Sequence, residues 1–385
     1  MFKIGTLNKI SPKGLAKLGN NYEIIDDVND ADGILVRSFK MHDMEFSPNL
    51  KSIARAGAGV NNIPLDRCAE EGIVVFNTPG ANANAVKELV FAAMFAEARN
   101  IVKGVEWVSE LEAAGINEAV EKGKSNFAGT ELAGKKIAVI GLGAIGVSVA
   151  KTAADIGMDV MGYDPYMSVA SALNLYSIIN VTDDKAELLA DADYVTVHIP
   201  ALANTKGMIN SETFAKLTKP AKLLNFSRAE IVNADDMEAA LAEGIISKYI
   251  TDFPTERFQS HPQVMNLPHL GASTEEAEEN CAMMAAEEIA DYLENGNIKN
   301  SVNFPACSMG VPRAAGRISI IHKNSNDSIT AITAACNELA VKIENMTAVS
   351  KGDFAYTLLD LDKSISQEEA AKISFEGSIS VRIIK

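Results

Sequence analysis

The stretch KKIAVIGLGAIGVSVAKTAADIGMDVMGYDP, residues 135–165, decides the fold that we expect for this chain. An apolar strand pattern leads into the spacing G-x-G-x-x-G, which opens an apolar helix pattern and is followed by a second strand pattern. In such a unit the first glycine permits a tight turn, the second lets a pyrophosphate approach the backbone, and the third lets helix and strand pack closely. The stretch therefore predicts a Rossmann unit whose helix N-terminus faces the phosphates of a dinucleotide.

The acidic end of the second strand favours NAD as the nucleotide. Asp164 stands at about the twenty-residue spacing that the fingerprint requires. A carboxylate there accepts hydrogen bonds from both ribose hydroxyls and repels a 2′-phosphate, and no arginine follows immediately. A solvated carboxylate at a strand end is the alternative interpretation. From this unit we expect the cofactor to contact Gly141, Gly143, Ala144, Ile145, Gly146 and Asp164.

Alternating strand and helix patterns extend on both sides of this unit, which favours parallel sheets with ligands at the strand ends. One long helix pattern with a polar interruption covers Val86 to Val120. Another covers Ser273 to Glu294, with Ser273 as the N-cap. Between these helices, after the nucleotide unit, four further strand patterns occur in YVTVHIP, KLLNFS, KYITDF and QVMNLPHL.

Charge and composition exclude several classes of function. The formal net charge of −16 disfavours nucleic acid and anionic membranes as partners, because both reward a basic surface. No apolar run reaches the roughly 18–20 residues that span a bilayer, and the amino terminus shows no signal-peptide pattern. The four cysteines are scattered without a C-x-x-C pair, so we expect no disulfide, no metal and a cytoplasmic location.

Three charged residues each follow an apolar strand pattern downstream of the nucleotide unit. They are Arg228 in LLNFSRAEIVN, Glu256 in YITDFPTERF and His269 in NLPHLGAST. Because the carboxyl ends of parallel strands meet at one edge of a sheet, we expect the three side chains to face one crevice. Taken singly, a surface cation, a turn acid and a packed turn residue remain alternative interpretations.

Together, the motifs GLGAIG, NFSR, DFPTE and PHLGAST resemble, in that order, the pattern of the D-2-hydroxy acid dehydrogenase family over essentially residues 1–300. The resemblance implies that His269 accepts the hydroxyl proton of the substrate, that Glu256 stabilises the imidazolium, and that Arg228 holds the substrate carboxylate. Two departures are visible: SRA stands where the family has SRG, and Thr251 stands where the family has Asp, which puts Asp252 one place later. The resemblance further implies cofactor contacts at His198, Pro200, Phe226, Ser227, Asp252 and Gly271.

Two stretches near the amino terminus, LVRSF and RAGAGVNNI, resemble those family members that oxidise 3-phospho-D-glycerate. In that group, arginines at these positions bind the substrate phosphate, and a glycine-rich loop offers backbone N–H groups to the carboxylate. Two exposed cations without a ligand are the alternative. The resemblance implies substrate contacts at Arg37, Ser38, Arg55, Gly57, Ala58, Gly59 and Val60.

The last part of the chain, residues 315–385, predicts the order β-α-β-β-α-β of a ferredoxin-like domain. It resembles the ACT regulatory domain found on many of these dehydrogenases. Relatives inhibited by serine have the motif H-x-N-x-P-G and a later Asn. Here His322 and Asn324 are retained, whereas Asn326–Asp327 replaces Pro-Gly and Lys342 replaces the later Asn. We therefore expect an ACT domain that dimerises by its sheet, with weak or no inhibition by serine.

The expected fold is α/β, with two Rossmann-like parallel-sheet domains and a C-terminal ferredoxin-like ACT domain. We expect a substrate-binding domain from residues 1–98 and 272–300, an NAD-binding domain from 99–271, a linker over 301–314 and the ACT domain over 315–385. The expected reaction is the NAD-dependent oxidation of 3-phospho-D-glycerate to 3-phosphohydroxypyruvate, the first step of L-serine biosynthesis, in a homodimer or homotetramer. The alternative within the family is a hydroxypyruvate or glyoxylate reductase. Outside it, the alternatives are a redox-dependent binding module and an amino-acid-binding regulator.

Overall fold

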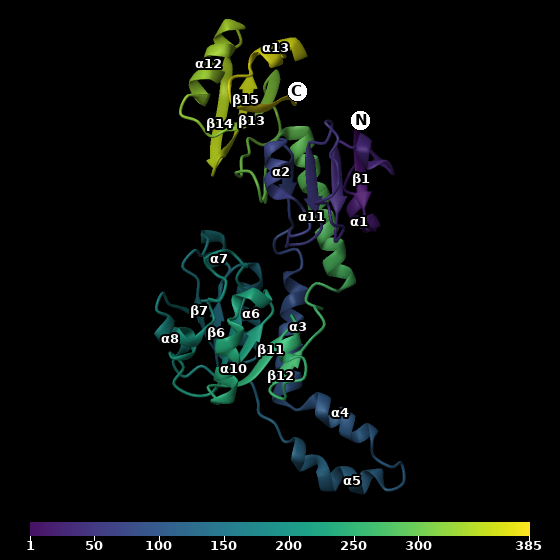
Figure 1. The fold of residues 1–385 in the computed structure, drawn as a ribbon, viewed down its shortest axis with the longest axis vertical. Helices are drawn as coiled ribbons and strands as arrows, with labels where there is room; N and C mark the ends of the chain where they lie inside the picture. Colours follow the sequence, from purple (N-terminus) through teal and green to yellow (C-terminus); the bar gives the residue numbers. More distant parts are fainter. The chain divides into compact units, whose positions relative to one another are not determined.

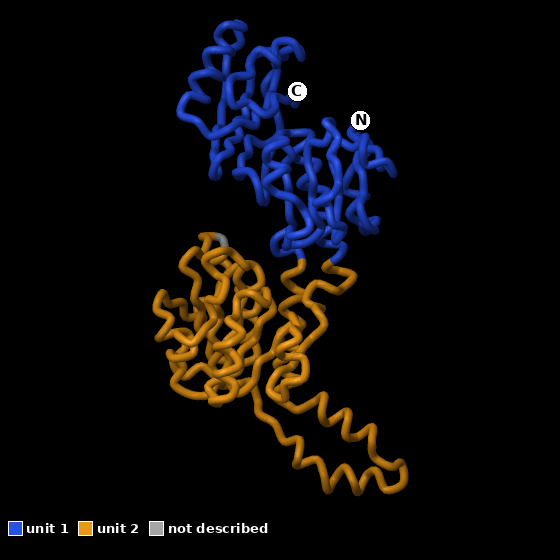
Figure 2. The backbone as a smooth tube through the Cα atoms, in the orientation of Figure 1, with its two compact units in different colours: residues 1–81, 278–385 blue, residues 82–277 orange. Residues whose placement is uncertain are grey.

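The computed structural model describes residues 1–169 and 171–385 (Figure 1). These residues divide into two units, which Figure 2 colours separately. Unit 1 consists of residues 1–81 and 278–385, and unit 2 consists of residues 82–277. Within the described part of the chain, no helix is both long and apolar enough to cross a membrane.

A seven-stranded sheet in the order β12-β11-β10-β9-β6-β7-β8 forms the centre of unit 2. Every neighbouring pair is parallel, and β6 pairs with both β7 and β9. The winding therefore reverses between β6 and β9, which is where ligands bind in doubly wound sheets. The strands are β6 (Lys136–Ile140), β7 (Asp159–Tyr163), β8 (Asn180–Val181), β9 (Tyr194–Val197), β10 (Ala221–Asn225), β11 (Ile246–Thr251) and β12 (Val264–Asn266).

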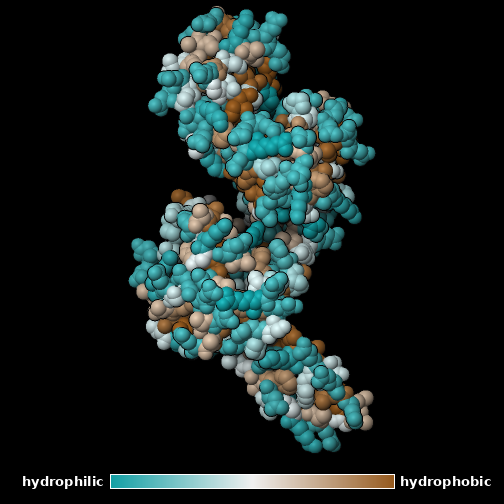
Figure 3. Space-filling view, viewed as in Figure 1, coloured by the Kyte–Doolittle hydropathy of each residue, from teal (hydrophilic) through white to brown (hydrophobic). Residues whose placement is uncertain are grey.

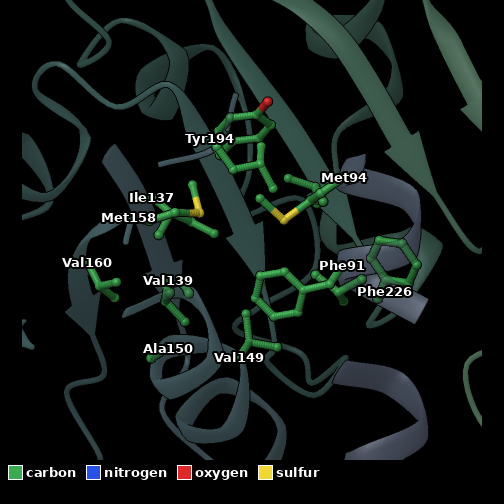
Figure 4. Close-up of a cluster of buried hydrophobic side chains, with 14 of the residues drawn as sticks. Phe91, Met94, Ile137, Val139, Val149, Ala150, Met158, Val160, Tyr194 and Phe226 are labelled. Atoms are coloured by element: carbon green, nitrogen blue, oxygen red, sulfur yellow. The ribbon is translucent and has the colours of Figure 1, made fainter. Parts of the chain in front are cut away.

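Helices cover both faces of this sheet. On one face, Phe91 and Met94 of α3 share a buried cluster with Ile137 and Val139 of β6 (Figure 4). On the other face, α8 and α10 contribute to a second buried cluster. The longer helices of unit 2 are α3 (Ala83–Ala98), α4 (Ile101–Ser109), α5 (Ile116–Gly123), α6 (Ala144–Asp155) and α10 (Ala234–Ala242). The short ones are α7 (Val169–Leu173), α8 (Lys185–Leu189), α9 (Ser211–Phe214), η2 (Lys124–Phe127), η3 (Ala229–Ile231) and η4 (Glu256–Phe258).

The helix pattern that we expected as one interrupted element from Val86 to Val120 forms three helices. Asn100 has φ +51° between α3 and α4, and Gly115 has φ +80° immediately before α5. A left-handed residue cannot continue a right-handed helix, so the chain changes direction at both places. The arm formed by α4 and α5 extends from the rest of unit 2 (Figure 1).

Unit 1 contains a five-stranded parallel sheet in the order β2-β1-β3-β4-β5. Ala282 and Ile289 of α11 share a buried cluster with Ile4 of β1 and Phe76 of β5, so this helix covers one face of the sheet. The elements are β1 (Phe2–Leu7), α1 (Pro12–Leu15), β2 (Tyr22–Ile25), η1 (Val28–Asp30), β3 (Gly33–Val36), β4 (Ser52–Arg55), α2 (Leu65–Glu70), β5 (Val74–Phe76) and α11 (Glu275–Asn295).

The remainder of unit 1 is a four-stranded antiparallel sheet in the order β14-β15-β13-β16. Ile318 and Leu359 on one face share a buried cluster with its two helices, and Tyr356 and Leu358 share the cluster of α11 and β1. The elements are β13 (Gly316–Lys323), α12 (Ser328–Glu338), β14 (Ile343–Lys351), β15 (Phe354–Leu361), α13 (Gln367–Lys372) and β16 (Ser378–Ile383). The predicted fold class, with two parallel sheets and a ferredoxin-like C-terminal part, is confirmed.

The units do not divide where we expected the domains to divide. We expected boundaries at 98/99 and 271/272, and the observed ones lie at 81/82 and 277/278. α3 belongs to unit 2 because its apolar side chains join the cluster of β6, and because Glu97 forms an ion pair of 2.7 Å with Lys222. Residues 301–385 fall within unit 1, because the C-terminal sheet shares the core of the amino-terminal one.

The start of α11 also differs from the sequence expectation. The helix begins at Glu275, and the hydroxyl of Thr274 accepts a hydrogen bond of 3.1 Å from the Ala277 N–H. Thr274 therefore takes the capping role that we expected for Ser273. The sequence favours Ser273, because Glu276 stands three residues later as in a capping box, whereas Ala277 stands at that place relative to Thr274.

Candidate active site

The three glycines of the G-x-G-x-x-G motif lie where β6 ends and α6 begins. Gly141 has φ +92°, and a Cβ there would lie 2.5 Å from the carbonyl oxygen of His198. A Cβ on Gly146 would lie 1.8 Å from the Gly141 oxygen, so only glycine fits at either place. A Cβ on Gly143 would have no atom within 4 Å, which leaves open space at the start of α6. Ala144 and Ile145 open the helix, so their N–H groups lie in its first turn. This geometry fits the pyrophosphate of a dinucleotide.

Asp164 joins the end of β7 to the glycine turn. Its Oδ2 accepts a hydrogen bond of 2.8 Å from the Leu142 N–H, and its Oδ1 accepts one of 2.9 Å from the Tyr166 N–H. A carboxylate has about four acceptor positions, so each oxygen keeps a lone pair for a further donor. The carboxylate is thereby fixed beside the turn with capacity to accept hydrogen bonds from ribose hydroxyls.

His198 lies behind the glycine turn with its ring turned inward. Nε2 lies 2.9 Å from the Thr196 hydroxyl, and within the described residues Nδ1 has no hydrogen-bond partner. Burial lowers the pKa of His198 to about 3, so the ring is neutral near pH 7. The carbonyl of His198 borders Gly141, and the expected contact of His198 with the cofactor stays a prediction.

The expected cofactor contacts Pro200, Phe226 and Ser227 follow the ends of β9 and β10. The Ser227 hydroxyl donates a hydrogen bond of 2.7 Å to the Val197 carbonyl, which joins the ends of the two strands. Phe226 is buried. Pro200 is exposed, and its carbonyl accepts a hydrogen bond of 2.6 Å from the Thr205 hydroxyl.

Arg228 and His269 both contact the aromatic ring of Phe253. The Arg228 Cζ lies 5.8 Å from the centroid of the Phe253 ring, and the imidazole centroid of His269 lies 4.8 Å from that centroid at 54°. The Asn225 side chain donates a hydrogen bond of 2.9 Å to the Arg228 carbonyl, and Arg228 Nη1 donates one of 2.7 Å to the Ser227 carbonyl. The sequence expectation that Arg228 and His269 face one crevice is therefore consistent with their shared contact.

Glu256 is the third expected catalytic residue. It is the first residue of η4 and is exposed to solvent. Among the described residues, no hydrogen bond joins its carboxylate to His269. Glu256 follows Phe253 by three positions in the chain. The carboxylate–imidazole hydrogen bond that the resemblance implies is not formed among the described residues.

Phe253 is a site residue that the sequence reasoning did not single out. It lies inside the quoted motif DFPTE, between two residues that were singled out, and its backbone N–H donates a hydrogen bond of 3.1 Å to the Thr251 hydroxyl. The available signal was the aromatic residue directly after an apolar strand, at the same edge as Arg228 and His269.

Asp252 has partners other than those we expected. Its side chain is 1% exposed, and its two oxygens accept hydrogen bonds from the backbone N–H groups of Leu270 and Gly271. We expected both Asp252 and Gly271 at the cofactor. The buried carboxylate contacts instead the loop that follows His269.

Unit 1 carries the expected substrate residues at the carboxyl ends of adjacent strands. Arg55 ends β4, and its Nε donates a hydrogen bond of 3.0 Å to the carbonyl of Arg37, which follows β3. Arg37 forms an ion pair with Glu278, and both side chains are partly exposed. The Ser38 N–H donates a hydrogen bond of 2.9 Å to the Asn8 side chain.

The glycine-rich loop after β4 is open at its centre. The Gly57 N–H donates a hydrogen bond of 2.8 Å to the Arg55 carbonyl, so it is not available to a ligand. In the described structure, the N–H groups of Ala58, Gly59 and Val60 donate to no protein acceptor. Three consecutive donors of this kind can bind an anion, which fits the role that the resemblance implies for the loop.

The chain is similar to known proteins in sequence. Residues 91–271 match the D-isomer specific 2-hydroxyacid dehydrogenase, NAD binding domain family. The chain is 36% identical over 294 residues to a D-3-phosphoglycerate dehydrogenase of Methanocaldococcus jannaschii, covering 74% of this chain and 54% of that protein. It is 34% identical over 321 residues to one of Mycobacterium bovis, covering 77% and 58%.

The fold is also similar to solved structures. A cofactor (NAD+)-bound 3-phosphoglycerate dehydrogenase of Entamoeba histolytica superposes with a TM-score of 0.62 at 28% identity, covering 78% of this chain and 98% of that chain. The chain spans little more than half the length of the two curated relatives named above.

Proposed function

We propose that the chain, whose residues 91–271 match the D-isomer specific 2-hydroxyacid dehydrogenase, NAD binding domain family, oxidises 3-phospho-D-glycerate to 3-phosphohydroxypyruvate. That reaction would supply the first intermediate of L-serine biosynthesis. The observation that carries the proposal is the shared contact of Arg228 and His269 with Phe253, at the same edge of the parallel sheet as the glycine turn.

The residues of unit 2 divide the reaction between them. Bound NAD supplies the hydride acceptor. The exposed imidazole of His269 takes the hydroxyl proton, since histidine is the side chain that most often transfers protons in enzymes. Arg228, half-buried and held at its backbone by Asn225, binds the substrate carboxylate with its guanidinium fork. The resemblance assigns to Glu256 the carboxylate that stabilises the imidazolium, although no hydrogen bond joins Glu256 to His269 among the described residues.

Unit 1 supplies the groups for the phosphate and carboxylate of the substrate. Arg37 and Arg55 follow adjacent parallel strands, and the loop from Ala58 to Val60 offers N–H donors beside them. A substrate with two anionic groups needs more cations than Arg228 alone, which favours phosphoglycerate over glyoxylate. Steady-state kcat/KM for 3-phospho-D-glycerate compared with D-glycerate and hydroxypyruvate tests this choice.

The His269→Ala variant tests the proposed chemistry. Loss of the proton acceptor should lower kcat by about 100- to 10,000-fold, while the Kd for NADH, measured by fluorescence, stays unchanged. Near wild-type turnover of this variant would refute the assignment. The absence of any NADH formation by the wild-type protein with phosphoglycerate would refute the proposed substrate.

Pairing of two copies through the α4–α5 arm is part of the same proposal. Apolar side chains on α4 are exposed, and Figure 3 shows apolar surface among polar residues on this arm. Their exposed fractions are 47% for Ile101, 49% for Val102, 65% for Val105 and 41% for Val108. Light scattering of the wild type and of Val105→Glu tests it, and a monomeric wild type would contradict it. We propose a homodimer, with the C-terminal sheets as a route to a homotetramer.

We propose that residues 315–385 are an ACT regulatory domain with weak or no response to serine. His322 is 2% exposed, its Nδ1 lies 2.8 Å from the Lys323 carbonyl, and its Nε2 lies 3.0 Å from the Thr357 hydroxyl. The Asn324 side chain donates a hydrogen bond of 3.1 Å to the Gly352 carbonyl. Both retained residues are thus engaged within the domain. Titration of activity with L-serine tests this, and inhibition at micromolar serine would refute it.

The cysteines support a reducing compartment, and we propose the cytoplasm. Cys68, Cys281, Cys307 and Cys336 are all free and buried.

A further inference from the structure

We propose that Asp252 is a positioning residue for His269, which holds the loop after that histidine through two backbone hydrogen bonds. The inference rests on the proposed function, because it assigns to Asp252 the task of orienting the proton acceptor. It differs from a cofactor contact, which is the role that the resemblance implied for this residue.

The backbone of Asp252 is hydrogen-bonded to the neighbouring strand, and its side chain contacts the loop. Its N–H donates a hydrogen bond of 3.2 Å to the Asn225 carbonyl at the end of β10, and its side chain is 1% exposed. Oδ1 accepts a hydrogen bond of 2.8 Å from the Leu270 N–H, and Oδ2 accepts one of 2.7 Å from the Gly271 N–H. Hydrogen bonds to an ionised acceptor are about twice as strong as neutral ones. The carboxylate therefore joins the sheet to the two residues directly after His269.

The backbone of His269 needs such support. Its φ is +55°, a left-handed conformation that a residue with a Cβ adopts only at an energetic cost. Conformations of this kind persist where the surrounding structure fixes them, and they concentrate at functional sites. The two hydrogen bonds to Asp252 begin one residue after His269, so they fix the exit of the chain from the left-handed residue.

The same strand end also fixes the imidazole. Phe253 follows Asp252 directly, and its ring lies 4.8 Å from that of His269. Asp252 thus holds the backbone of the loop, and Phe253 contacts the side chain that the loop presents. Together the two consecutive residues determine where the imidazole lies relative to Arg228, which contacts the same ring.

The Asp252→Asn variant separates positioning from mere stability. An amide offers one acceptor oxygen and two N–H donors, so one of the two loop N–H groups loses its acceptor. Misplacement of a catalytic group by about 1 Å can cost 100-fold in rate. We expect kcat to fall by about 100-fold, while the KM for 3-phospho-D-glycerate and the Kd for NADH stay within about twofold of wild type.

Hydrogen exchange tests the hydrogen bonds from Leu270 and Gly271 to Asp252 without a measurement of activity. In Asp252→Asn, the amides of Leu270 and Gly271 should exchange roughly tenfold faster, because each loses or weakens its hydrogen bond. Mass spectrometry of peptides that cover residues 264–277 measures this in the folded chain of residues 1–385.

Asp193→Asn is the matched control. The Asp193 carboxylate also accepts a backbone hydrogen bond, of 2.9 Å from the Lys136 N–H, but it precedes β9 and lies at the amino ends of the strands. Its removal should change neither kcat nor exchange at Leu270 and Gly271. A kcat for Asp252→Asn equal to that of Asp193→Asn, or unchanged exchange of the two amides, would overturn the inference.

A second variant keeps the inference testable if Asp252→Asn does not fold. A Cβ at Gly271 would lie 3.1 Å from Asp252 Oδ2 and 3.4 Å from Val86 Cγ2, so Gly271→Ala displaces the carboxylate without removing its charge. It should show the same fall in kcat and the same faster exchange. If the wild-type protein forms no NADH, the proposed function fails. Faster exchange at Leu270 and Gly271 in either variant would still support the role of Asp252 in holding the loop. Unchanged exchange would still refute that role.

Discussion

The ring of Phe253 lies against the imidazole of His269, with 4.8 Å between centroids and 54° between planes. The guanidinium carbon of Arg228 lies 5.8 Å from the centroid of the same ring. One aromatic side chain therefore contacts both the proposed proton acceptor and the proposed carboxylate-binding group. It relates the positions of both groups to the end of β11.

We expect Phe253→Leu to lower kcat by about tenfold, because a ring contact of this kind contributes about 0.5–1.5 kcal/mol and orients the imidazole. Steady-state rates measure the loss, and the fluorescence-derived Kd for NADH should stay constant. Phe214→Leu is the control, since Phe214 is buried in a different cluster of unit 2. Equal turnover of the two variants would show that Phe253 has no orienting role.

Two alanine substitutions in the glycine turn should have different effects: one should lower stability and the other should lower the affinity for NADH. In Gly146→Ala the added Cβ would lie 1.8 Å from a backbone oxygen, so we expect unit 2 to lose on the order of 3 kcal/mol of stability. In Gly143→Ala the Cβ meets no protein atom within 4 Å, so stability should hold while the methyl group obstructs the pyrophosphate.

Fluorescence of the single tryptophan, Trp107 in α4, monitors the unfolding of unit 2 in urea. Fluorescence titration with NADH measures the affinity, which we expect to fall about tenfold or more in Gly143→Ala. A stable Gly146→Ala protein, or unchanged NADH affinity in Gly143→Ala, would contradict the assigned roles.

Glu288 makes the stability of unit 1 depend on pH. Its side chain is 6% exposed, Oε1 accepts a hydrogen bond of 2.6 Å from Asn300, and within the described residues Oε2 has no partner. Burial raises the pKa of Glu288 from its ordinary 4.5 to about 8. Between these values the folded state binds a proton that the unfolded state has released, so its stabilising contribution is complete below about pH 4.5 and is lost as pH rises through 8.

Glu288→Gln should remove this dependence, because the amide does not ionise. We expect the stability of the wild type to fall relative to the variant by on the order of 3 kcal/mol between pH 5 and pH 8. Calorimetry at several pH values measures the difference. Glu287→Gln, whose carboxylate forms a partly exposed ion pair with Lys17, is the control and should follow the wild-type curve. Parallel curves for wild type and Glu288→Gln would contradict the raised pKa.

Local patterns were sufficient to predict much of this fold. The strand, glycine turn and helix of residues 135–165 form as expected, because period, turn chemistry and spacing all indicate the same structure. The β-α-β-β-α-β order of the tail is likewise a local property of alternating apolar residues. Arg228 and His269 could be placed at one edge, because parallel strands bring their carboxyl ends together.

Features that depend on tertiary packing could not be predicted in this way. α3 is apolar on several faces, so its pattern does not tell which unit it joins; the cluster around Phe91 and the Glu97–Lys222 ion pair determine that. Asp252 stands directly after a buried strand, where a charged residue must find partners. The sequence shows that Asp252 requires hydrogen-bond donors, but it does not show which loop provides them. The donors, Leu270 and Gly271, lie eighteen and nineteen positions away.

Buried side chains of the C-terminal sheet form hydrogen bonds with the backbone at the carboxyl end of α11. Arg317 is 1% exposed and binds Asp360 through two hydrogen bonds of 2.6 and 3.0 Å. It also donates to the Asn295 carbonyl at 3.1 Å, and the Tyr356 hydroxyl donates to the Gly296 carbonyl at 2.6 Å. These donors satisfy carbonyl groups that a helix end leaves free.

We expect Arg317→Met to destabilise unit 1 by about 3–5 kcal/mol, because it leaves the Asp360 carboxylate buried without its partner. The double variant with Asp360→Leu should recover most of this loss, since a buried ion pair is roughly replaceable by apolar side chains. Lys3→Met, which breaks the exposed pair with Asp30, is the control and should change the stability far less than Arg317→Met does. Calorimetric unfolding of the three proteins measures the differences. A double variant as unstable as Arg317→Met would show that the lost contacts with the carbonyls of Asn295, Met309 and Gly310, and not the unpaired carboxylate, cause the destabilisation.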